Sequence, residues 1–404
     1  MRILLLHQNF PGQFRQLVPY LLSRGHELKA ICSHNRLLPQ HPGLSFLRYK
    51  APDAPPRDLH HGVHLWHDAL MRSQQVGELM IQLDSENWKP HRILAHCGWG
   101  ETLPVKEIWP DVPLIIWPEL WIRPEHMGIG EHQGQGPKKP EIQIQYLSRN
   151  ALTEASLAQA SAWVLPTMHQ ATSFPTAYQS QKMHVIHEGI DCNLACPNPD
   201  VKYEVRGVSI DRSIPTITFV NRNLERLRGF DTFMRALPLI QTQYPTLRVL
   251  IVGDNEGGYG GGHPSGLPLK KVMLEELKGQ LDLERIHFLG RIPHPYLISL
   301  LQASWVHVYL SYPFILGWSL LEAMACGCCI VGSRNMPVSE VISDGLNGML
   351  VPITDHKLLA KRVVALLSND RLRNELGFAA RQTALAWDQT IMLPKLSNLV
   401  ESLE

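Results

Sequence analysis

Short apolar stretches alternate with amphipathic stretches along most of the chain, and this alternation limits the fold more than any other feature. The apolar stretches of the first half are "RILLLHQ", "ELKAICSH", "RILAHC" (92–97), "PLIIWPE" (113–119), "AWVLPT" (162–167) and "HVIHEG" (184–189). Each has the length and composition of a buried strand, and helical patterns lie between them. Strands that alternate with helices form parallel sheets covered on both faces, so we predict an α/β fold.

The alternation stops once and then starts again. Residues 196–215 are polar, contain prolines and lack periodicity, which predicts a linker or an entry loop. The strand patterns that follow are "TITFVNR", "LRVLIVGD", "RIHFLGR", "VHVYLSYP", "CIVGS" and "GMLVP". The chain has 404 residues, too many for one ordinary core, and this suggests two domains of about 200 residues each. We predict two Rossmann-like, doubly wound domains that face a cleft, residues 1–195 and 196–387, with a last helix at about 388–404 crossing back onto the first.

Charge and composition exclude several classes of protein. Lys and Arg number 38 against 37 Asp and Glu, so bulk charge gives no reason to expect nucleic acid as a partner. No apolar run reaches the roughly 18 residues of a membrane span, and "MRILLLHQNF" does not have the pattern of a signal peptide. We therefore expect a cytoplasmic protein. The seven cysteines fit reduced thiols, and "CGCC" (326–329) is typical of a packed segment rather than a metal site.

Three arginines follow the first strand pattern of the second domain, in "VNRNLERLRGF" (220–230). Arg222, Arg226 and Arg228 lie at a strand end, where doubly wound sheets bind ligands. Guanidinium groups suit phosphate oxygens because they keep their charge and donate two parallel hydrogen bonds. A solvated basic loop would contain the same cluster of arginines. The position of the cluster at a strand end favours a diphosphate site.

One carboxylate, Glu322, stands in the apolar stretch "YPFILGWSLLEAMACG" (312–327). Ser319 and Glu322 have the spacing of a capping box, in which the glutamate only closes the start of a helix. Alternatively, Glu322 accepts hydrogen bonds from two neighbouring hydroxyls, as ribose-binding carboxylates do. The spacing leaves both readings open. Gly317 leads into the same helix, whose N-terminus offers a second anion site.

Polar groups also follow successive strand patterns of the first domain. They occur in "HQNFPGQF", "AHCGWGE" and "WPELWIRPEH", and the candidates are Gly12, His96, Trp99, Glu101, Glu119 and Arg123. A single such group is more often structural, but several at the ends of one sheet indicate a site. Two Gly-rich loops, 128–140 and 257–266, are expected on the surface near strand ends.

Taken together, these motifs resemble the retaining glycosyltransferases of family 4, which have the GT-B fold. The motifs are "VIHEGID" (185–191), "VNRN…RGFDTF", "LRVLIVGD", "IHFLGRI" and "LLEAMACG…IVGS…SEVISDGLNGMLV". The resemblance covers essentially the whole chain. The start "HQNFPGQF", with "GWGE", is similar to a bacterial subgroup found with polysaccharide and glycoconjugate synthesis.

The resemblance implies a nucleotide-sugar donor, with a UDP-sugar favoured over a GDP-sugar, and no further cofactor. It implies that Arg222 and Arg228 bind the donor diphosphate, and that Arg228 stands where lysine is usual. The other implied donor contacts are Ile292 to the nucleobase, Glu322 to the ribose, Gly317, Trp318 and Ser319 around phosphates and sugar, and Gly12 in a glycine loop. No Asp-x-Asp motif occurs, so arginines and helix dipoles rather than Mg²⁺ are expected to hold the diphosphate.

The chain departs from the family pattern at two positions. Phe314 stands where the first of two glutamates is usual, and Glu119 stands where a histidine follows the strand "PLIIW". We expect Glu119 to contact the donor sugar or the acceptor hydroxyl and to assist proton removal, with His96 as the weaker candidate. Trp99, Glu101, Arg123 and the 122–141 loop are assigned to the acceptor side.

The expected acceptor is a glycan, a glycolipid or a small glycoside. The resemblance allows peripheral contact with the inner face of a membrane, and either a monomer or a homodimer. Two other functions stay open: a GT-B sugar-nucleotide 2-epimerase, and a non-catalytic partner protein that binds a sugar nucleotide. Fold analogy does not choose among these three.

Overall fold

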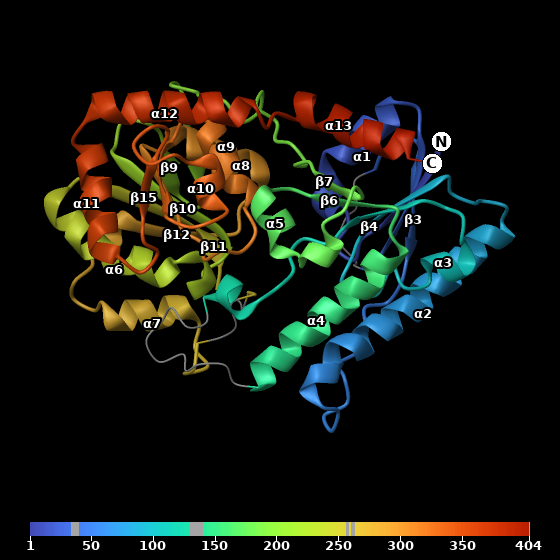
Figure 1. The fold of residues 1–404 in the computed structure, drawn as a ribbon. Helices are drawn as coiled ribbons and strands as arrows, with labels where there is room; N and C mark the ends of the chain where they lie inside the picture. Colours follow the sequence, from blue (N-terminus) through green and yellow to red (C-terminus); the bar gives the residue numbers. More distant parts are fainter. Residues whose placement is uncertain (34–39, 129–139, 256–257, 260–262, 404) are drawn as a thin grey trace. The chain divides into compact units, whose positions relative to one another are not determined.

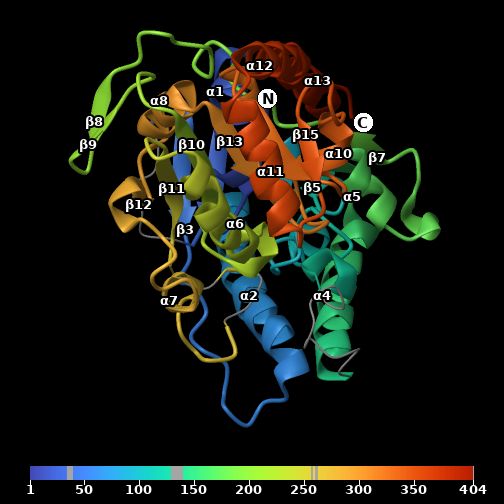
Figure 2. The ribbon, with the colours of Figure 1, turned by 90° about the vertical axis from the view of Figure 1, so that its left-hand side faces the viewer.

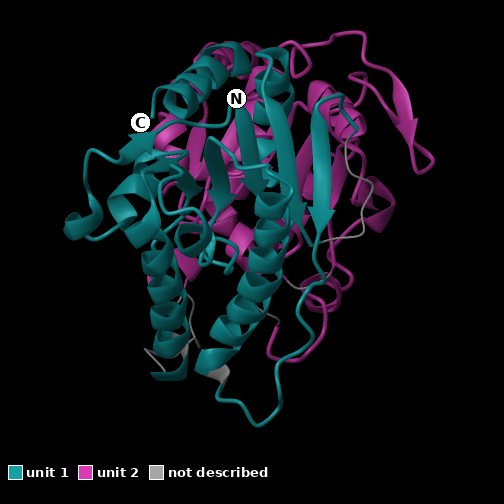
Figure 3. Cartoon of the chain, turned by 90° about the vertical axis from the view of Figure 1, so that its right-hand side faces the viewer, with its two compact units in different colours: residues 1–124, 136–189, 389–404 teal, residues 125–135, 190–388 magenta. Residues whose placement is uncertain are grey.

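The structure is a computed structural model that describes residues 1–33, 40–128, 140–255, 258–259 and 263–403 (Figure 1). The chain divides into two compact units. Unit 1 comprises Met1–Pro124, Gly136–Gly189 and Gln389–Glu404, and unit 2 comprises Glu125–Gln135 and Ile190–Asp388. Figure 3 colours the two units and shows both chain termini in unit 1. The main segment of unit 2 thus begins at Ile190, a few residues before the expected position 196, and the unit also includes a short segment after Pro124 that the sequence did not indicate.

Unit 1 contains a seven-stranded parallel sheet in the order β3-β2-β1-β4-β5-β6-β7. Its strands are β1 (Arg2–Leu6), β2 (Glu27–Cys32), β3 (Leu44–Arg48), β4 (Arg92–His96), β5 (Leu114–Trp117), β6 (Ala162–Leu165) and β7 (Met183–Val185). The helices of this unit are α1 (Leu17–Ser23), α2 (His64–Ser85), α3 (Val105–Ile108), α4 (Pro140–Gln159), α5 (Met168–Ser173) and α13 (Gln389–Ser402).

Strand β1 explains why both faces of this sheet are covered. Successive side chains of a strand point to opposite faces. Ile3 and Leu5 belong to the apolar cluster that includes residues of α1 and α13, whereas Leu4 and Leu6 belong to the cluster that includes residues of α2 and α3. All four are completely buried, so the run "ILLL" has no polar member. This uninterrupted apolar run is the signature of a central parallel strand.

Unit 2 contains a six-stranded parallel sheet in the order β12-β11-β10-β13-β14-β15. Its strands are β10 (Thr216–Asn223), β11 (Arg248–Asp254), β12 (Ile286–Gly290), β13 (Val306–Tyr309), β14 (Cys329–Ser333) and β15 (Met349–Val351). The helices are α6 (Phe230–Gln243), α7 (Leu269–Glu276), α8 (His294–Ala303), α9 (Trp318–Ala325), α10 (Val338–Val341), α11 (His356–Leu367) and α12 (Asp370–Leu385). Phe219 of β10 stacks on Phe233 of α6 with ring centroids 4.6 Å apart, and Val220 belongs to the cluster of α8, α9 and α12 on the other face.

Residues 196–215 are not simply a linker, and this expectation was wrong in part. They contain an antiparallel hairpin of β8 (Tyr203–Val205) and β9 (Val208–Ile210), visible beside α8 in Figure 2. Arg206 and Gly207 both have positive φ, 52° and 76°, the backbone of a two-residue type I′ turn. Asparagine is more usual than arginine at the first turn position, and the sequence therefore did not predict a hairpin here.

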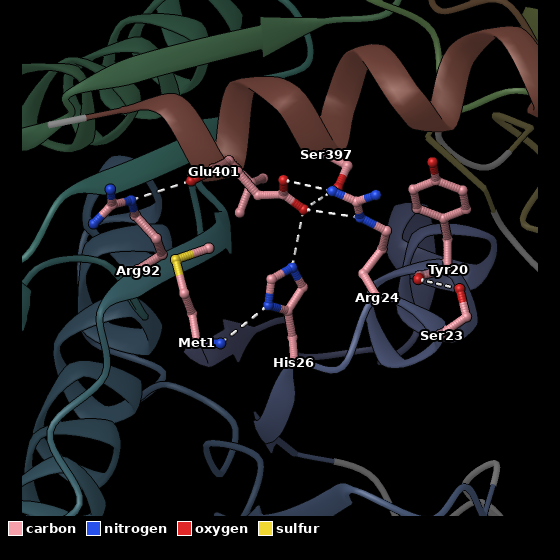
Figure 4. A network of polar contacts seen from close by, with 9 residues as sticks. Met1, Tyr20, Ser23, Arg24, His26, Arg92, Ser397 and Glu401 are labelled. Carbon is pink, nitrogen blue, oxygen red and sulfur yellow. Dashed lines mark hydrogen bonds and ion pairs between the residues drawn. The ribbon is translucent and has the colours of Figure 1, made fainter.

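The last helix, α13, is bound to unit 1 through polar contacts near its C-terminal end (Figure 4). Glu401 accepts hydrogen bonds from Arg24 Nη2 at 3.0 Å and from Ser397 Oγ at 2.8 Å, and it lies 3.0 Å from His26 Nε2. Arg92 donates through Nε to the carbonyl of Val400 at 3.1 Å. Among the described residues, none of the helices combines the length and the apolar character needed to cross a membrane.

Strand order sets where ligands are expected. In unit 1 the chain runs from β1 outward to β3 and then returns to β4 on the other side of β1. In unit 2 it runs from β10 outward to β12 and returns to β13 on the other side of β10. Loops that leave such neighbouring strands in opposite directions open a crevice at the carboxyl edge, where doubly wound sheets bind ligands.

Candidate functional site

The edge of unit 2 at which ligands are expected lies at the carboxyl ends of β10 and β13, and one glycine brings their loops together. Gly229 has a φ of 65°, and a Cβ added there would lie 2.5 Å from Cβ of Leu310. Only glycine allows both this left-handed backbone and this close approach. The arginine before it, Arg228, is therefore held against the β13 loop, where its Nη1 donates to Ser311 Oγ at 2.8 Å and to the carbonyl of Ile315 at 3.0 Å.

The three arginines of this loop differ in their ion pairs. Arg226 Nε lies 3.4 Å from Oδ2 of the buried Asp231, which also accepts from Arg235 at 3.2 Å. Arg228 forms no ion pair with any described residue. Arg222 is exposed and makes neither an ion pair nor a hydrogen bond within the described part of the chain. Two of the three positive charges thus lack an anionic partner, although they lie at the edge where ligands are expected.

Phe314 occupies the position where a glutamate was expected, and it lies against Arg228. The Arg228 guanidinium carbon is 5.3 Å from the centroid of the Phe314 ring, which is 4% exposed. Tyr259 approaches the same ring with centroids 5.5 Å apart. A phenyl ring attracts the guanidinium through its face but does not neutralise its charge. The substitution therefore leaves a stronger positive charge at this edge than a glutamate would.

Helix α9 begins at Trp318 with Gly317 as its N-cap, and no side chain caps it. The N–H of Gly317 donates to the Tyr309 hydroxyl at 2.7 Å. Glu322 lies in the second turn, is 8% exposed, and its Oε1 is 2.6 Å from Nε2 of His294. The capping-box reading of Ser319 and Glu322 is therefore wrong: Ser319 lies inside the helix, and Glu322 turns toward α8.

The other donor-side candidates surround this region of unit 2. Ile292 follows β12, is partly buried and packs on the same apolar cluster as α8 and α9. Trp318 and Ser319 are partly exposed in the first turn of α9. At the neighbouring strand ends, Arg291 Nε pairs with Asp254 Oδ2 at 3.0 Å. The carboxyl ends of β10, β11, β12 and β13 thus each contribute polar or candidate groups.

The corresponding edge of unit 1 holds a chain of contacts that starts at the end of β1. The N–H of Asn9 donates to Nδ1 of His7 at 3.0 Å, so the neutral ring carries its proton on Nε2. Nε2 then donates to Gln13 Oε1 at 2.6 Å, and Gln13 Nε2 donates to Glu119 Oε1 at 2.8 Å. His96, at the end of β4, lies with its Nε2 3.1 Å from the same oxygen and stacks on His7 at 4.8 Å.

These contacts set the charges of the site. Burial, together with the neighbouring His96, lowers the pKa of His7 to about 3, so His7 is neutral at physiological pH. Burial raises the pKa of Glu119, but the charge and hydrogen bond of His96 and the charge of Arg149 outweigh it and leave the pKa at about 2. Glu119 is therefore a permanent anion. Gln13 donates to Oε1 and His96 Nε2 lies 3.1 Å from the same oxygen, whereas no described residue donates to Oε2, on a side chain that is 21% exposed.

Backbone geometry holds Glu119 and Gly12 in this arrangement. Glu119 has a φ of 58°, which is strained for a residue with a side chain, and Gln170 supports the turn by donating to its carbonyl at 2.8 Å. Gly12 has a φ of 49°, and a Cβ there would lie 2.0 Å from Nε2 of His7. Gly12 thus lies directly on the His7 ring, and the glycine loop is built around the imidazole.

The three acceptor-side candidates do not join this group. Glu101 is 1% exposed, accepts from the Tyr49 hydroxyl at 2.9 Å, and has a pKa that burial raises. A side chain so deeply buried supports the fold and does not touch an acceptor, so its assignment is corrected. The guanidinium of Arg149 lies 4.5 Å over the ring of Trp99. Arg123 is exposed and donates to the carbonyl of Ser173 at 3.1 Å. Most of the 122–141 loop lies outside the described residues.

Three residues of these sites were not indicated by the sequence. His7 and Gln13 stand in the motif "HQNFPGQF", in which only Gly12 was predicted as a site residue. His294 stands in "RIPHPY", next to the candidate Ile292. Each of them contacts a side chain that is distant in sequence or lies across a tight turn. Residue spacing and hydrophobic periodicity do not predict such contacts.

Comparisons with known proteins agree with this architecture. A family model described as "Glycosyl transferase family 4 group" matches residues 24–195, and one described as "Glycosyl transferases group 1" matches residues 206–383. A D-inositol 3-phosphate glycosyltransferase of Corynebacterium urealyticum is 28% identical over 293 residues, which cover 68% of this chain and 64% of that one. A phosphatidyl-myo-inositol mannosyltransferase of Mycobacterium leprae is 28% identical over 193 residues, covering 46% of each chain. The matched stretches span less than two thirds of the length of these relatives.

Solved structures with the same fold include a sucrose-phosphate synthase from Thermosynechococcus elongatus, with a TM-score of 0.77, 17% identity, and coverage of 100% of this chain and 99% of that one. HepE from Anabaena, in complex with UDP-glucose, has a TM-score of 0.67, 15% identity, and complete coverage of both chains. Together the two family models match most of the sequence. The chain belongs to the glycosyltransferases with the GT-B fold, with a family 4 group module followed by a group 1 module.

Proposed function

We propose that the protein transfers a sugar from a nucleotide-sugar donor, a UDP-sugar in the first instance, to a hydroxyl acceptor, with retention of configuration and without a metal ion. The observation that carries the proposal is the difference among three neighbouring arginines. Arg226 is neutralised by Asp231, whereas Arg222 and Arg228 have no anionic partner among the described residues. Arg228 is half-buried, and an unpaired guanidinium that is partly removed from water is costly unless a ligand supplies the negative charge. Arg222 is exposed and is available to the same ligand.

A diphosphate is the ligand that fits these charges. Arg228 already uses Nη1 on Ser311 and Ile315, so its remaining N–H groups are oriented by fixed contacts before any ligand binds. Such preorganised donors stabilise charge that develops in a transition state. In glycosyl transfer that charge develops on the diphosphate as it leaves the anomeric carbon. Glu322 then takes the ribose hydroxyls and the backbone at Ile292 takes the nucleobase, as the family resemblance implies.

Glu119 serves in the proposal as a hydrogen-bond acceptor for a sugar hydroxyl rather than as a general base. A carboxylate with a pKa of about 2 is too weak a base to remove a hydroxyl proton efficiently near neutral pH. As an anion with Oε2 available, it can orient a hydroxyl of the donor sugar or of the acceptor. The acceptor oxygen then forms its bond to the anomeric carbon on the face where the bond to the diphosphate breaks, and the leaving phosphate oxygen takes the acceptor proton.

Similar proteins indicate which donor and which acceptors to test first. HepE, which shares the fold, has been solved with UDP and with UDP-glucose, and this supports a UDP-sugar as the first donor to test. The relatives named above act on inositol phosphate and phosphatidylinositol acceptors, so polyol and glycolipid hydroxyls belong in an acceptor panel. Peripheral contact with a membrane and the choice between monomer and homodimer remain predictions.

The deciding experiment compares arginine variants by calorimetry with UDP, GDP, ADP and the nucleoside uridine. Arg222→Ala and Arg228→Ala should each weaken nucleoside diphosphate binding about 10-fold or more, the value of a charged hydrogen bond of roughly 1.5–3 kcal/mol. Arg226→Ala is the matched control, because it removes a guanidinium from the same loop while Asp231 keeps Arg235. Uridine binding should not change in any variant.

Two results would contradict the proposal. Equal weakening in all three variants would mean that the loop attracts anions only through its net charge. Absence of binding to any of the three diphosphates would remove the donor site itself. Incubation of the wild type with UDP-sugars and no acceptor tests the open alternative function, because a sugar-nucleotide isomer as product identifies an epimerase.

A further inference from the structure

The closest polar contact of Glu322 is made by a residue outside the motif that contains it. His294 Nε2 lies 2.6 Å from Glu322 Oε1, a short distance typical of a hydrogen bond to a charged group. The carboxylate accepts this bond, so the imidazole carries its proton on Nε2. His294 is 28 residues away in sequence and lies in another helix. The contact therefore depends on how α8 and α9 pack, which the apolar cluster shared by Ile298, Leu301, Leu320 and Met324 fixes.

The backbone around His294 is unusually restricted. It is the first residue of α8 and stands between Pro293 and Pro295. Each proline fixes its own φ, and a proline also restricts the residue before it. The imidazole therefore projects from a segment with little conformational freedom. A donor on such a segment can hold a flexible glutamate side chain in one rotamer without losing much entropy of its own.

The second oxygen of Glu322 is the part of the group that remains available. Glu322 is 92% buried, since only 8% of its surface is exposed, yet no described residue donates to Oε2. A carboxylate held at one oxygen by protein and left available at the other is suited to a ligand that brings its own hydroxyl donors.

We propose that His294 is a positioning residue that turns the Glu322 carboxylate toward the ribose, and so sets the preference of unit 2 for ribonucleotides over deoxyribonucleotides. The inference rests on the proposed function, in which Glu322 binds the ribose of the donor. A merely structural tie between α8 and α9 would instead stabilise the protein and affect all nucleotides alike. The two roles can therefore be distinguished by the ratio of the affinities for a ribonucleotide and for the matching deoxyribonucleotide.

The test measures that ratio by calorimetry with two pairs of probes, UDP with 2′-deoxy-UDP and GDP with 2′-deoxy-GDP, so that it does not depend on the base. The wild type should prefer the ribose form of the bound nucleotide by about 10-fold or more, the value of a hydrogen bond to a charged group. In His294→Ala the preference should fall to about threefold or less, and the affinity for the deoxy form should change by less than about threefold.

Two further variants make the comparison specific. His294→Gln keeps an N–H donor near the position of Nε2 and should restore most of the preference. Tyr296→Phe alters an exposed side chain in the same turn of α8 and should leave both affinities unchanged. Melting temperatures of all variants separate a loss of folding from a loss of preference.

The possible failures can be told apart. Equal weakening of ribose and deoxyribose forms in His294→Ala, or a preference that persists in it, overturns the positioning role and leaves the proposed function intact. A wild type that binds UDP and 2′-deoxy-UDP equally removes Glu322 as the ribose ligand, and the inference with it. A wild type that binds none of the four probes contradicts the donor site of the proposed function.

Discussion

Glu119 illustrates how the surroundings of one residue change its chemistry. The sequence assigned it a role in proton removal, because a carboxylate stands where a histidine is usual. In the structure its charge is stabilised by His96 and Arg149, and Gln13 donates to the same oxygen. The donors that hold Glu119 in place thus also make it a poor base. In the proposed function it is an anion that orients a hydroxyl.

This role predicts a specific pH dependence. Since the pKa of Glu119 is about 2, its carboxylate is ionised throughout pH 5–9, and its titration cannot produce an acidic limb in that range. Glu119→Gln should lower donor turnover by about 10-fold or more and leave the shape of the profile of kcat/KM between pH 5 and 9 unchanged. The measurement is UDP release in the presence of an accepted hydroxyl compound. An acidic limb that disappears in Glu119→Gln would restore the general-base role.

Gly12 allows a second prediction at this scale, because the chain contains a matched control. Both Gly12 and Gly25 have positive φ, 49° and 80°, but an added Cβ clashes with His7 only at Gly12 and meets nothing within 4 Å at Gly25. Gly25→Ala should cost about 1–2 kcal/mol of unfolding free energy for the left-handed backbone alone. Gly12→Ala should cost more and should also weaken turnover, because His7 must move.

Urea unfolding measures the free energies of both variants. Equal costs for Gly12→Ala and Gly25→Ala, with turnover intact, would show that the His7 ring yields easily. The chain of contacts from His7 to Glu119 would then not depend on the glycine loop.

At the level of single residues, the sequence could predict which side chains reach the carboxyl edges but not what they contact. Gly12, His96 and Glu119 were found because each follows a strand, and they do lie together. Glu101 follows β4 as well, yet it turns inward to Tyr49. Its direction depends on the loop of Gly98 and Gly100, both with positive φ, and no periodicity specifies that turn.

Among the elements, long apolar strands were predictable and features set by local backbone geometry were not. Every parallel strand except β3 coincides with a predicted apolar run, because strands buried on both faces need such runs. Strand β3 was missed because it is an edge strand with no fully buried residue. The β8–β9 hairpin was missed because its turn is Arg206–Gly207. The capping box predicted at the start of α9 was wrong. Ser319 and Glu322 have the residue types and the spacing of a capping box, but the helix already begins at Trp318.

Helix α13 provides a prediction about stability. Hydrogen bonds from Arg24, His26 and Ser397 lower the pKa of Glu401 to about 2, below the usual value of a glutamate in an unfolded chain. A lowered folded-state pKa stabilises the protein above the unfolded pKa, and this stabilisation is lost as the pH falls toward 2. Glu401→Gln should therefore reduce the unfolding free energy by about 1 kcal/mol at pH 7, because the pair is partly exposed, and by much less near pH 3.

The control for Glu401→Gln is Glu375→Gln, which breaks an exposed pair with Arg371 on α12. Surface substitutions of this kind usually change stability by less than about 0.5 kcal/mol. Urea denaturation at a series of pH values gives both numbers. A penalty for Glu401→Gln that is the same at pH 3 and pH 7 would mean that the ionised carboxylate does not hold α13.

The whole molecule is two doubly wound units, and the duplicated alternation in the sequence was enough to predict this class of fold. The exact division into units was not predictable, because residues 125–128 belong to unit 2 although they lie between elements of unit 1 in sequence. Their assignment depends on contacts in space: a Cβ at Gly128 would lie 2.8 Å from the ring of Tyr312. Such long-range contacts cannot be predicted from local sequence patterns.

The chain enters the main segment of unit 2 at Ile190 and leaves it at Asp388, and these two residues are neighbours. Ile190 and Asp388 form an isolated parallel bridge, and the N–H of Ile190 donates to the carbonyl of Trp387 at 3.0 Å. On the other side of the same boundary, Gly189 lies so close to Gln389 that a Cβ would be 2.8 Å from its Cα. The two ends of the 190–388 segment are therefore adjacent in space. A segment with adjacent ends can be exchanged between related chains, by recombination or by grafting, without displacing the residues at either junction.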